Sequence, residues 1–387
     1  WASSHASNAR LRLLWLTNTL SGVPSAISSP RLMKKAVLST SSPLTDVPAL
    51  PSTTVCKSAQ VLAPALPKSV VQLWRFPVKS MGGTPVDRLR IDRRGVHADR
   101  LWAVRDVERD ITASARKVPA LLGCSARYAA EPGPDAGPGN APEVLITLPD
   151  GTELSSADPG VDAALSTVAD REVRLTSLPA ADDVSLHRLS IRQSRAGFAP
   201  SEVRSDFGLS DTEALPDTSV FSTRQMLTLA RFATPPGTFV DLSPVHLLST
   251  TSLASLAGAG LPYDVRRFRP NVLVELAQPG GGYPESGWVG AQVTVGAVTV
   301  RVTNPTIRCV VPTRAQPGLE PDRALTRRLA EATDRFLGIY ADVTGPGVVQ
   351  VGDPVQVGVP AAAGVWRRTA AAAGQATMRG LQSVLEA

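Results

Sequence analysis

The run VVQLWRFPVKS, residues 70–80, marks the point at which the sequence changes character and a fold begins. It is rich in β-branched and aromatic residues and ends in a turn at Gly82-Gly83, a composition typical of a β-strand followed by a reversal of the chain. Short runs of the same kind follow at residues 86–96, 99–107, 124–130 and 143–156, the last of them a hairpin about Pro149-Asp150-Gly151. The first half of the ordered chain is therefore predicted to consist of short strands, with one short helix leading into a strand within 158–179.

A second block of strand patterns starts at TFVDLSPVHLLS, residues 238–249, and returns at 266–277, 291–303 and 347–358. Within it, the segments 251–260 and 321–336 have apolar residues at helical spacing, so we expect helices there. Many short strands with few helices predict a mainly β (α+β) protein in which one β-barrel-like region precedes another. We place these regions at 70–190 and 238–358, with an irregular linker at 191–237.

Both ends of the chain differ in composition from these blocks. Residues 1–69 are rich in Ser, Ala and Pro and have no acidic residue before Asp46, which is typical of a disordered or targeting leader. Met33 with the two lysines after it could equally be the true start, which would make the preceding residues an artefact; artefact and disorder are favoured over a working transit peptide. The Ala-rich tail, 359–387, is expected to form a peripheral helix or to fray.

Composition limits the classes of function. The chain of 387 residues has a net charge of +6, and most of its cationic side chains are Arg, which suits phosphate and carboxylate, so we expect an anionic ligand. Nucleic-acid binding is not expected, because aromatic residues make up only 5% and basic residues do not cluster on one element. No apolar run approaches the roughly 20 residues that cross a bilayer, so no transmembrane segment is expected.

The three cysteines, Cys56, Cys124 and Cys309, lie far apart and form no C-x-x-C pair, as expected in a reducing compartment. With only four histidines, the chain supplies neither a structural zinc site nor four thiolates for an iron–sulfur cluster. The sequence therefore predicts no built-in electron relay. A cytoplasmic location is expected, with organelle targeting by the leader as the alternative.

Cys309 lies in NPTIRCVVPTR, residues 304–314, at the end of a predicted strand and next to Arg308. Positive charge from Arg308 and Arg314 is expected to lower the pKa of the thiol and to favour the thiolate that binds metals or attacks electrophiles. The alternative is a buried structural cysteine, which is the common fate of a lone Cys. The residues alone leave both interpretations open.

Six segments, taken in order, resemble the MOSC family, and especially the mitochondrial amidoxime-reducing component and its bacterial relatives. They are LWRFPVKSMGG (73–83), DRLWAV (99–104), SPVHLLSTTSLASL (243–256), RRFRPNVLVE (266–275), the Cys309 segment, and GIYADV (338–343) with VQVGDPV (349–355). The resemblance covers about 70–358 and implies an N-terminal MOSC β-barrel region followed by a MOSC domain. It also implies that Cys309 is the thiolate ligand of molybdenum in the molybdenum cofactor (Mo-molybdopterin).

The resemblance further assigns residues that contact this cofactor. Lys79 and Ser80 match the family's Lys-Ser pair, and Arg100 matches the Arg of an Asp-Arg element in which Asp99 is expected to orient Arg100. Ammonium, hydroxyl and guanidinium groups are the donors that a pterin phosphate needs. The remaining matches are Ser243, Arg269, Asn271, Arg308 and Tyr340. Taken singly, each of these residues could be an ordinary surface or core residue.

Arg269 and Asn271 belong to R-F-R-P-N, and their spacing on a strand is expected to point both side chains to one face. The chain also departs from the family. Leu242 and Ile307 replace polar residues, and Met81 stands where well-known members have another Cys, which puts a second thiol in doubt. His246 matches no contact position and is expected to be a packed core histidine.

The resemblance implies an oxidoreductase that reduces N-hydroxylated substrates by two electrons and releases water. Because no iron–sulfur module is expected in this chain, the electrons must come from a separate donor protein. The second class is a cofactor carrier or sulfur-handling module, because MOSC domains also form the tails of molybdenum-cofactor sulfurases, which associates the family with pyridoxal phosphate binding. Nothing upstream resembles a pyridoxal-phosphate domain, so that role needs delivery in trans. A metal-free barrel that binds an anionic small molecule is a third class.

Overall fold

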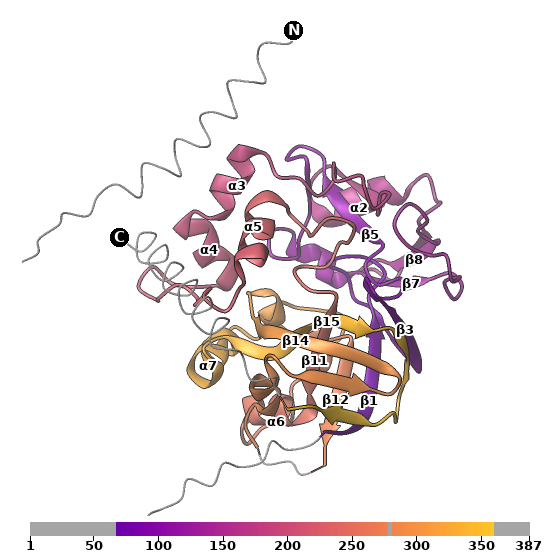
Figure 1. Ribbon diagram of the computed structural model, residues 1–387. Coiled ribbons are helices and arrows are strands. Elements are labelled where there is room, and N and C mark those ends of the chain that lie inside the picture. The colour runs from indigo at the N-terminus through magenta and orange to yellow at the C-terminus, as the bar shows by residue number, and fades with distance from the viewer. Residues whose placement is uncertain (1–66, 278–280, 360–387) are drawn as a thin grey trace, which may run out of the picture. The chain divides into compact units, whose positions relative to one another are not determined.

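The computed structural model describes residues 67–277 and 281–359, and its largest element is an eight-stranded sheet (Figure 1). All neighbouring strands are antiparallel except β11 and β12, a parallel pair connected through helix α6 (Thr250–Ala257). In order across the sheet the strands are β17 (Val355–Val357), β13 (Gln292–Val295), β14 (Val298–Ile307), β15 (Phe336–Gly345), β11 (Val245–Ser249), β12 (Val272–Leu276), β1 (Pro67–Arg75) and β2 (Thr84–Val86).

The sheet curls so that β1 approaches the far edge strand β17. The backbone N–H of Val70 donates to the carbonyl of Asp353 over 2.9 Å, and the N–H of Gly352 donates to the carbonyl of Val70 over 2.8 Å. Only an isolated bridge, Ser69 to Pro354, joins the two edges, so the sheet is barrel-like without being a closed barrel.

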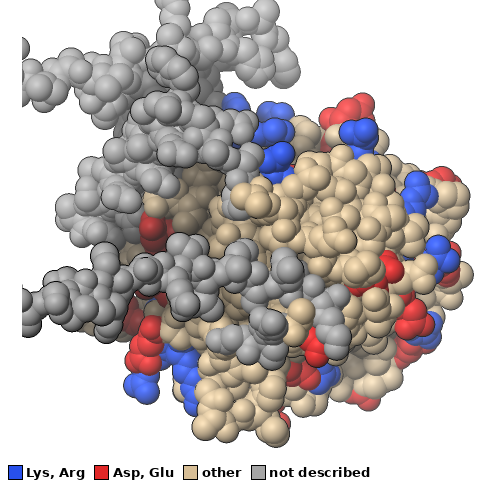
Figure 2. Space-filling view, turned by 60° about the horizontal axis from the view of Figure 1, so that its bottom comes forward, with Lys and Arg blue, Asp and Glu red and all other residues tan. Residues whose placement is uncertain are grey.

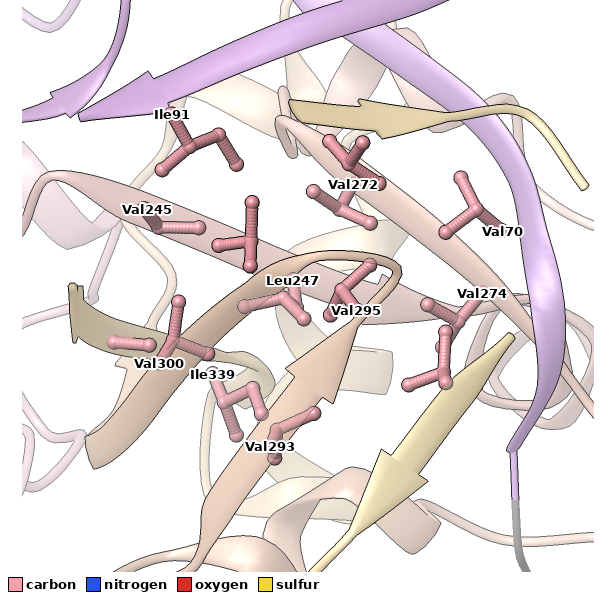
Figure 3. Close-up of a cluster of buried hydrophobic side chains, with 14 of the residues drawn as sticks. Val70, Ile91, Val245, Leu247, Val272, Val274, Val293, Val295, Val300 and Ile339 are labelled. Atoms are coloured by element: carbon pink, nitrogen blue, oxygen red, sulfur yellow. The ribbon is translucent and has the colours of Figure 1, made fainter. Parts of the chain in front are cut away.

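The interior of this curled sheet is filled by β-branched and aliphatic side chains. Alternate residues of β14 point inward, because successive side chains of a strand face opposite sides of a sheet. Figure 3 shows side chains from opposite strands converging on this core, among them Val70, Leu247, Val274, Val295 and Ile339. Apolar burial of this kind contributes about 25 cal/mol per Å², which makes this core the main stabilising element of the sheet.

Three smaller sheets hold most of the first half of the chain. Their strands are β10 (Val173–Ser177), β5 (Trp102–Asp106) and β6 (Ile111–Thr112); β7 (Ser125–Tyr128), β8 (Val144–Thr147) and β9 (Glu153–Ser155); and β16 (Gly347–Gln350), β3 (Arg88–Asp92) and β4 (Gly95–Val96). Helix α2 (Val161–Ala169) leads into β10, and β8 and β9 form a hairpin about residues 149–151, so both of these local predictions are confirmed. A second core packs α2 against these strands.

The two halves of the chain exchange strands. Strands β1 and β2 come from the first half and pair within the large sheet, while β16 comes from the second half and pairs with β3. The fold is mainly β with six α-helices in the described residues, as the sequence predicted. The expectations for the leader and the tail fall on residues that, apart from 67–69 and 359, lie outside the described part of the chain.

The expectation of an irregular linker at 191–237 is wrong, because the segment contains three helices. They are α3 (Ile191–Gly197), α4 (Pro200–Phe207) and α5 (Thr223–Arg231). Ser190 and Gln193 form a capping box at the start of α3, and Ser222 and Gln225 form one at the start of α5. In each box the Ser side chain accepts from the third helical N–H and the Gln side chain accepts from the cap, so two otherwise unpaired donors are satisfied.

The two helices expected in the second half are present but shorter than predicted. Helix α6 ends at Gly258, which has a positive φ of 64°. Helix α7 (Ala324–Thr333) ends at Asp334 in a left-handed conformation. Neither of these helices, nor any other within residues 67–277 and 281–359, is long and apolar enough to cross a bilayer.

Candidate functional site

Cys309 lies between the end of β14 and the 3-10 helix η4 (Val311–Thr313), and it is partly exposed. Burial among protein atoms raises the pKa of its thiol, and the charges of Arg116 and Arg308 and the N–H of Val311 oppose this rise without overcoming it. The charge of Arg308 lowers the pKa of the thiol as expected, but the expectation of a lowered net pKa is wrong, because desolvation of the thiolate outweighs the attraction of the cations. A metal ion would provide the missing stabilisation of the thiolate.

Asp241 stands at the centre of a cationic cluster beside Cys309. Its carboxylate pairs with the buried ammonium of Lys79, and its own side chain is 66% exposed, so the pair lies where the protein interior meets solvent. Desolvation raises the pKa of Asp241, but the charges of Lys79, Arg116 and Arg100 lower it further, and the net effect is a strongly lowered pKa. Lys79 shows the reverse balance: burial lowers its pKa, and Asp241 only partly compensates.

Three of the predicted cofactor contacts have left-handed backbone conformations. The φ angles are 71° at Ser80, 53° at Arg100 and 56° at Arg269. Residues with a Cβ rarely adopt this region, and when they do it is commonly at a functional site where the surrounding structure holds them in place. The coincidence of three such residues at one site supports a binding function for this part of the molecule.

Arg100 and Arg269 stack on the same aromatic ring. Their guanidinium carbons lie 5.0 and 4.4 Å from the centroid of Phe76. Arg100 pairs with Asp99, whose other oxygen accepts from the N–H of Phe76 over 2.7 Å, so the prediction that Asp99 orients Arg100 is confirmed. Arg269 donates through Nη1 to the carbonyl of Met81 over 2.5 Å, while its buried Nη2 has no partner among the described residues.

Asn271 and Arg308 have their polar groups occupied by the protein. The amide of Asn271 donates to Asp99 Oδ2 over 3.2 Å and accepts from the N–H of His246 over 3.3 Å. Arg308 donates to the carbonyls of Leu337 and Phe268 and contacts His246 Nε2 over 2.6 Å. Both residues are buried and position the chain around the site.

The expectation that Arg269 and Asn271 lie on one face of a strand is wrong, since both precede β12, which begins at Val272. The left-handed backbone at Arg269 interrupts the extended chain, so the two side chains take different directions. Arg269 reaches Met81, whereas Asn271 binds Asp99 and the backbone around it.

The two serines and Tyr340 complete the predicted set. Ser80 Oγ accepts from the N–H of Ala115 over 2.9 Å, and Ser243 is buried. The ring of Tyr340 lies 5.5 Å from that of His246, and burial, together with the charge of Asp241, raises the pKa of Tyr340 to about 12. The phenol is therefore a neutral donor at physiological pH.

Sequence reasoning missed Arg116 and Asp241. Arg116 forms an ion pair with Asp206 over 2.9 Å and is close enough to Cys309 and Asp241 for their charges to raise its pKa against the desolvation that lowers it. Arg116 lies in a loop of the first half, where hydrophobic periodicity gives no indication of a site residue. Asp241 could have been noticed as a lone carboxylate within the apolar run 238–249. His246 is buried as expected, yet it also connects Arg308 to the carbonyl of Arg269.

The assembled site has an excess of positive charge. Five cations, Lys79, Arg100, Arg116, Arg269 and Arg308, face three carboxylates, Asp99, Asp206 and Asp241. Burial and the neighbouring Arg100 lower the pKa of Arg269 to about 9, which leaves it cationic at neutral pH. In the described part of the chain no three His, Cys, Asp or Glu side chains gather as a metal site. The cluster therefore offers one thiol and an excess of cationic donors.

Two open cavities lie away from this cluster. One, of about 520 Å³, is lined by residues of the β3–β4 turn and by residues 346–348. The other, of about 430 Å³, lies between residues 119–125, the β8–β9 turn and residues 315–317. Neither cavity is lined by a predicted site residue.

Comparison with known families agrees with this architecture. The MOSC N-terminal beta barrel domain matches residues 68–186, and the MOSC domain matches residues 235–356. The chain belongs to the MOSC family, and its function is related to the molybdenum cofactor.

Among curated proteins the chain is similar to mitochondrial amidoxime-reducing component 1. It is 25% identical to the Homo sapiens protein over 316 residues, which are 74% of this chain and 82% of that one. It is 25% identical to the Mus musculus protein over 319 residues, 74% of this chain and 81% of that one. Neither match indicates pyridoxal phosphate binding, so that expectation has no support.

Two solved structures also resemble the chain, at TM-scores too low to bear on the fold. The YuaD protein from Bacillus subtilis is 12% identical, with a TM-score of 0.33, and the alignment covers 75% of this chain and 94% of that one. YiiM from Geobacillus stearothermophilus is 16% identical, with a TM-score of 0.24, over 38% of this chain and 79% of that one.

Proposed function

We propose that this protein is a molybdenum-cofactor oxidoreductase that reduces N-hydroxylated substrates with electrons from a separate donor protein. The observation that carries the proposal is the unpartnered, buried Nη2 of Arg269 within a cationic cluster that also holds a partly exposed thiol. A buried donor without a partner costs about 1–3 kcal/mol, which a native structure tolerates where a ligand supplies the acceptor.

The residues present fit a phosphorylated metal cofactor. Arg269, Arg100 and Lys79 offer charge-assisted donors to a phosphate, and a bidentate guanidinium is the donor best matched to phosphate geometry. Cys309 offers one soft sulfur to a metal whose other ligands come from the cofactor. When bound, the molybdenum cofactor would supply the two-electron redox chemistry.

The chain's own residues prepare the site for this chemistry. Binding of an anion at Lys79 would compete with Asp241 and release its carboxylate toward solvent, because the two now form an ion pair. Reduction of an N-hydroxyl group to an amine consumes two protons and two electrons and releases water. The protons come from solvent. The lowered pKa of Asp241 keeps its carboxylate ionised as the counterion of Lys79, while Tyr340 keeps its proton and donates a hydrogen bond.

The substrate class is taken from the relatives named above, which are named for the reduction of amidoximes, a class of N-hydroxylated compounds. A separate electron donor follows from the dispersed cysteines, two of which the structure describes as free thiols. A reducing compartment such as the cytoplasm would keep Cys309 available as a thiol.

The test combines cofactor content with catalysis. The protein is expressed in a host that makes the cofactor, and molybdenum and pterin fluorescence are measured in wild type and in Cys309→Ala. We expect molybdenum near stoichiometric in the wild type, with reduction of an aryl amidoxime by reduced methyl viologen, and loss of that activity in the variant.

The same experiment separates the alternatives. Bound cofactor without dye-driven reduction of any hydroxylamine-type compound would indicate a carrier or sulfur-handling module. Folded protein that contains neither molybdenum nor pterin would overturn the proposal and leave a metal-free barrel that binds an anion.

A further inference from the structure

Helices α3 and α5 form an exposed, arginine-rich surface that the proposed chemistry does not use. Stretches 188–201 and 218–240, which contain the two helices, have no Asp or Glu. We define the arginine surface by its exposed members, the basic side chains of Arg188, Arg192, Arg195, Arg224 and Arg231, and the apolar side chains of Ile191 and Leu227.

The contacts between the two helices bring these residues together. Ser194 Oγ of α3 donates to the carbonyl of Ala230 in α5 over 2.5 Å, and the N–H of Leu189 donates to the carbonyl of Arg231 over 2.9 Å. Figure 1 shows α3, α4 and α5 grouped together, away from α6.

Helical spacing places the arginines of α5 on its outer side. Residues 224, 227 and 231 follow one another at intervals of three and four, so they share one face of the helix. Gln225 lies on the other side, where its Nε2 donates to the buried Asn304 of β14 over 2.9 Å. Arg224, Leu227 and Arg231 therefore lie on one exposed face of α5, where the charge of Arg224 also reaches Asp342 of β15, and Arg192 and Arg195 share a face of α3 in the same way.

None of the five arginines forms an ion pair within residues 67–277 and 281–359. The neighbouring carboxylates of α4 are already engaged, Glu202 with Lys117 and Asp206 with both Lys117 and Arg116. Elsewhere the pattern differs: on the face in Figure 2, acidic and basic side chains mostly lie next to one another around a largely uncharged centre. Asp342 lies within reach of the charge of Arg224, so the arginine surface has five arginines against one nearby carboxylate that the described residues leave outside an ion pair, and it is a net cationic patch.

This patch lies close to the thiol of Cys309. The carbonyl of Asp206 in α4 accepts from the N–H of Val310, the residue after Cys309, over 2.9 Å. Asn304, which Gln225 binds, pairs with Tyr340 in the sheet. One layer of helices therefore separates the arginine surface from the site, a thickness on the order of 10–12 Å.

We propose that the arginine surface is the docking site of the separate electron donor, a small electron-transfer protein that presents carboxylates around its redox group. The inference rests on the proposed function, which requires such a donor. Arginines around two exposed apolar side chains, Ile191 at 58% and Leu227 at 57%, match the composition of protein interfaces, in which Arg is enriched. Unpaired cations also steer an acidic partner over long distances.

Other polyanions fit this surface less well. A single-stranded nucleic acid requires exposed aromatic rings for stacking, whereas the four phenylalanines of stretches 188–201 and 218–240, Phe198, Phe221, Phe232 and Phe239, are buried or partly buried. An anionic membrane requires a continuous apolar helix face, and α5 exposes one large apolar side chain, Leu227.

The test compares protein-driven with dye-driven turnover in the full, cofactor-loaded chain. Three acidic donors serve as probes: a plant-type [2Fe–2S] ferredoxin, a flavodoxin and a cytochrome b5, each with its reductase. We expect at least one of them to support amidoxime reduction at low salt. Arg192→Glu/Arg195→Glu and Arg224→Glu/Arg231→Glu should each lower kcat/KM for that donor by about tenfold or more, the size of long-range steering effects, and 0.5 M salt should remove the difference.

Matched controls separate docking from folding and chemistry. Arg88→Glu/Arg93→Glu makes the same charge change on exposed arginines of β3 and its turn, and should leave donor kinetics unchanged. All variants should keep full activity with reduced methyl viologen, which needs no docking surface.

The outcomes distinguish failure of docking from failure of the proposed function. If wild type lacks dye-driven activity, the proposed function itself fails. If dye-driven activity is present but no acidic donor works, or if the α3 and α5 variants behave like the control, the docking proposal is overturned. Arginine-dependent binding to phosphatidylserine-containing vesicles or to single-stranded DNA, with unchanged donor kinetics, would also overturn it.

Discussion

Arg269→Met and Arg308→Met should change the stability of the cofactor-free protein in opposite directions. Arg308 is satisfied by two carbonyls and His246, whereas Arg269 has one carbonyl partner and a buried nitrogen without any. If Arg269 serves to bind an anion, replacing it with methionine removes an unfavourable buried cation from the cofactor-free protein. Removing Arg308 leaves its buried partners without a donor.

The magnitudes follow from these contacts. Lowering the pKa of Arg269 from 12.5 to about 9 corresponds to about 4–5 kcal/mol against the buried cation. Methionine forfeits a hydrogen bond of about 1 kcal/mol and a stacking contact with Phe76 of about 1 kcal/mol. The net expectation for Arg269→Met is about 2 kcal/mol of added stability. The pKa of Arg308 is lowered to about 10, which by the same conversion is about 3 kcal/mol against that cation. Deleting Arg308 also leaves two carbonyls and His246 without a donor, at about 1–3 kcal/mol each, so Arg308→Met should cost about 2–3 kcal/mol net.

Urea unfolding of both variants, expressed in a host that cannot make the cofactor, measures these differences. A second preparation from a host that makes the cofactor should show that Arg269→Met retains less pterin than wild type. The reasoning is refuted if Arg269→Met destabilises the cofactor-free protein as much as Arg308→Met does, because Arg269 would then be an ordinary structural residue.

Three further substitutions test the site and its supports. Cys309→Ala should abolish dye-driven reduction while changing the free energy of unfolding by less than about 1 kcal/mol, since the side chain is small and partly exposed; a large loss of stability in urea would make Cys309 structural instead. Glu285 is buried and accepts from Ser252 Oγ over 2.6 Å, and burial raises its pKa above 4.5, so the folded state favours its protonated form. The wild type should therefore lose stability relative to Glu285→Gln as the pH rises above 4.5 toward the folded-state pKa. A difference in urea midpoint between the two proteins that is the same at pH 5 and at pH 8 would contradict this. Gly338→Ala should cost more than about 3 kcal/mol and eliminate activity, because its Cβ would lie 2.7 Å from His246 Nε2 at a φ of 76°, and a wild-type melting temperature would show that this contact can relax.

Local patterns predicted the strands well. The strand pattern at 291–303 and the hairpin about 149–151 are decided by neighbouring residues; the first is present as β13 and the start of β14, and the second as the β8–β9 hairpin. The helices at 191–237 were missed because they are short and bury no residue fully, although α5 is strongly amphipathic. Their Ser-x-x-Gln capping boxes were readable at Ser190 and Ser222 and were the available signal.

The hydrogen bonds within the site were less predictable than the identity of its residues. Family motifs identified Lys79, Arg100 and Arg269, but the motifs do not state which polar groups the protein itself consumes. Asn271 binds Asp99, while Arg269 keeps a nitrogen without a partner among the described residues. This difference depends on the left-handed backbone at Arg269, which the hydrophobic periodicity of the sequence does not reveal. Arg116 enters the site only because the loop that carries it folds against Cys309, a long-range event.

The pairing of β1 with β12 has a consequence for how the molecule is made. The first ordered strand leaves the ribosome about 200 residues before the strand that must lie beside it, so its hydrogen bonds wait until most of the chain has been synthesised. Such distant pairings slow folding. Because Lys79 follows β1 and Cys309 follows β14, the two sides of the site meet only after this wait, and loading of a prosthetic group becomes a late, post-translational event. A gene fragment that encodes the second half alone would yield a large sheet without β1 and β2, and one that encodes the first half alone would leave β3 without β16.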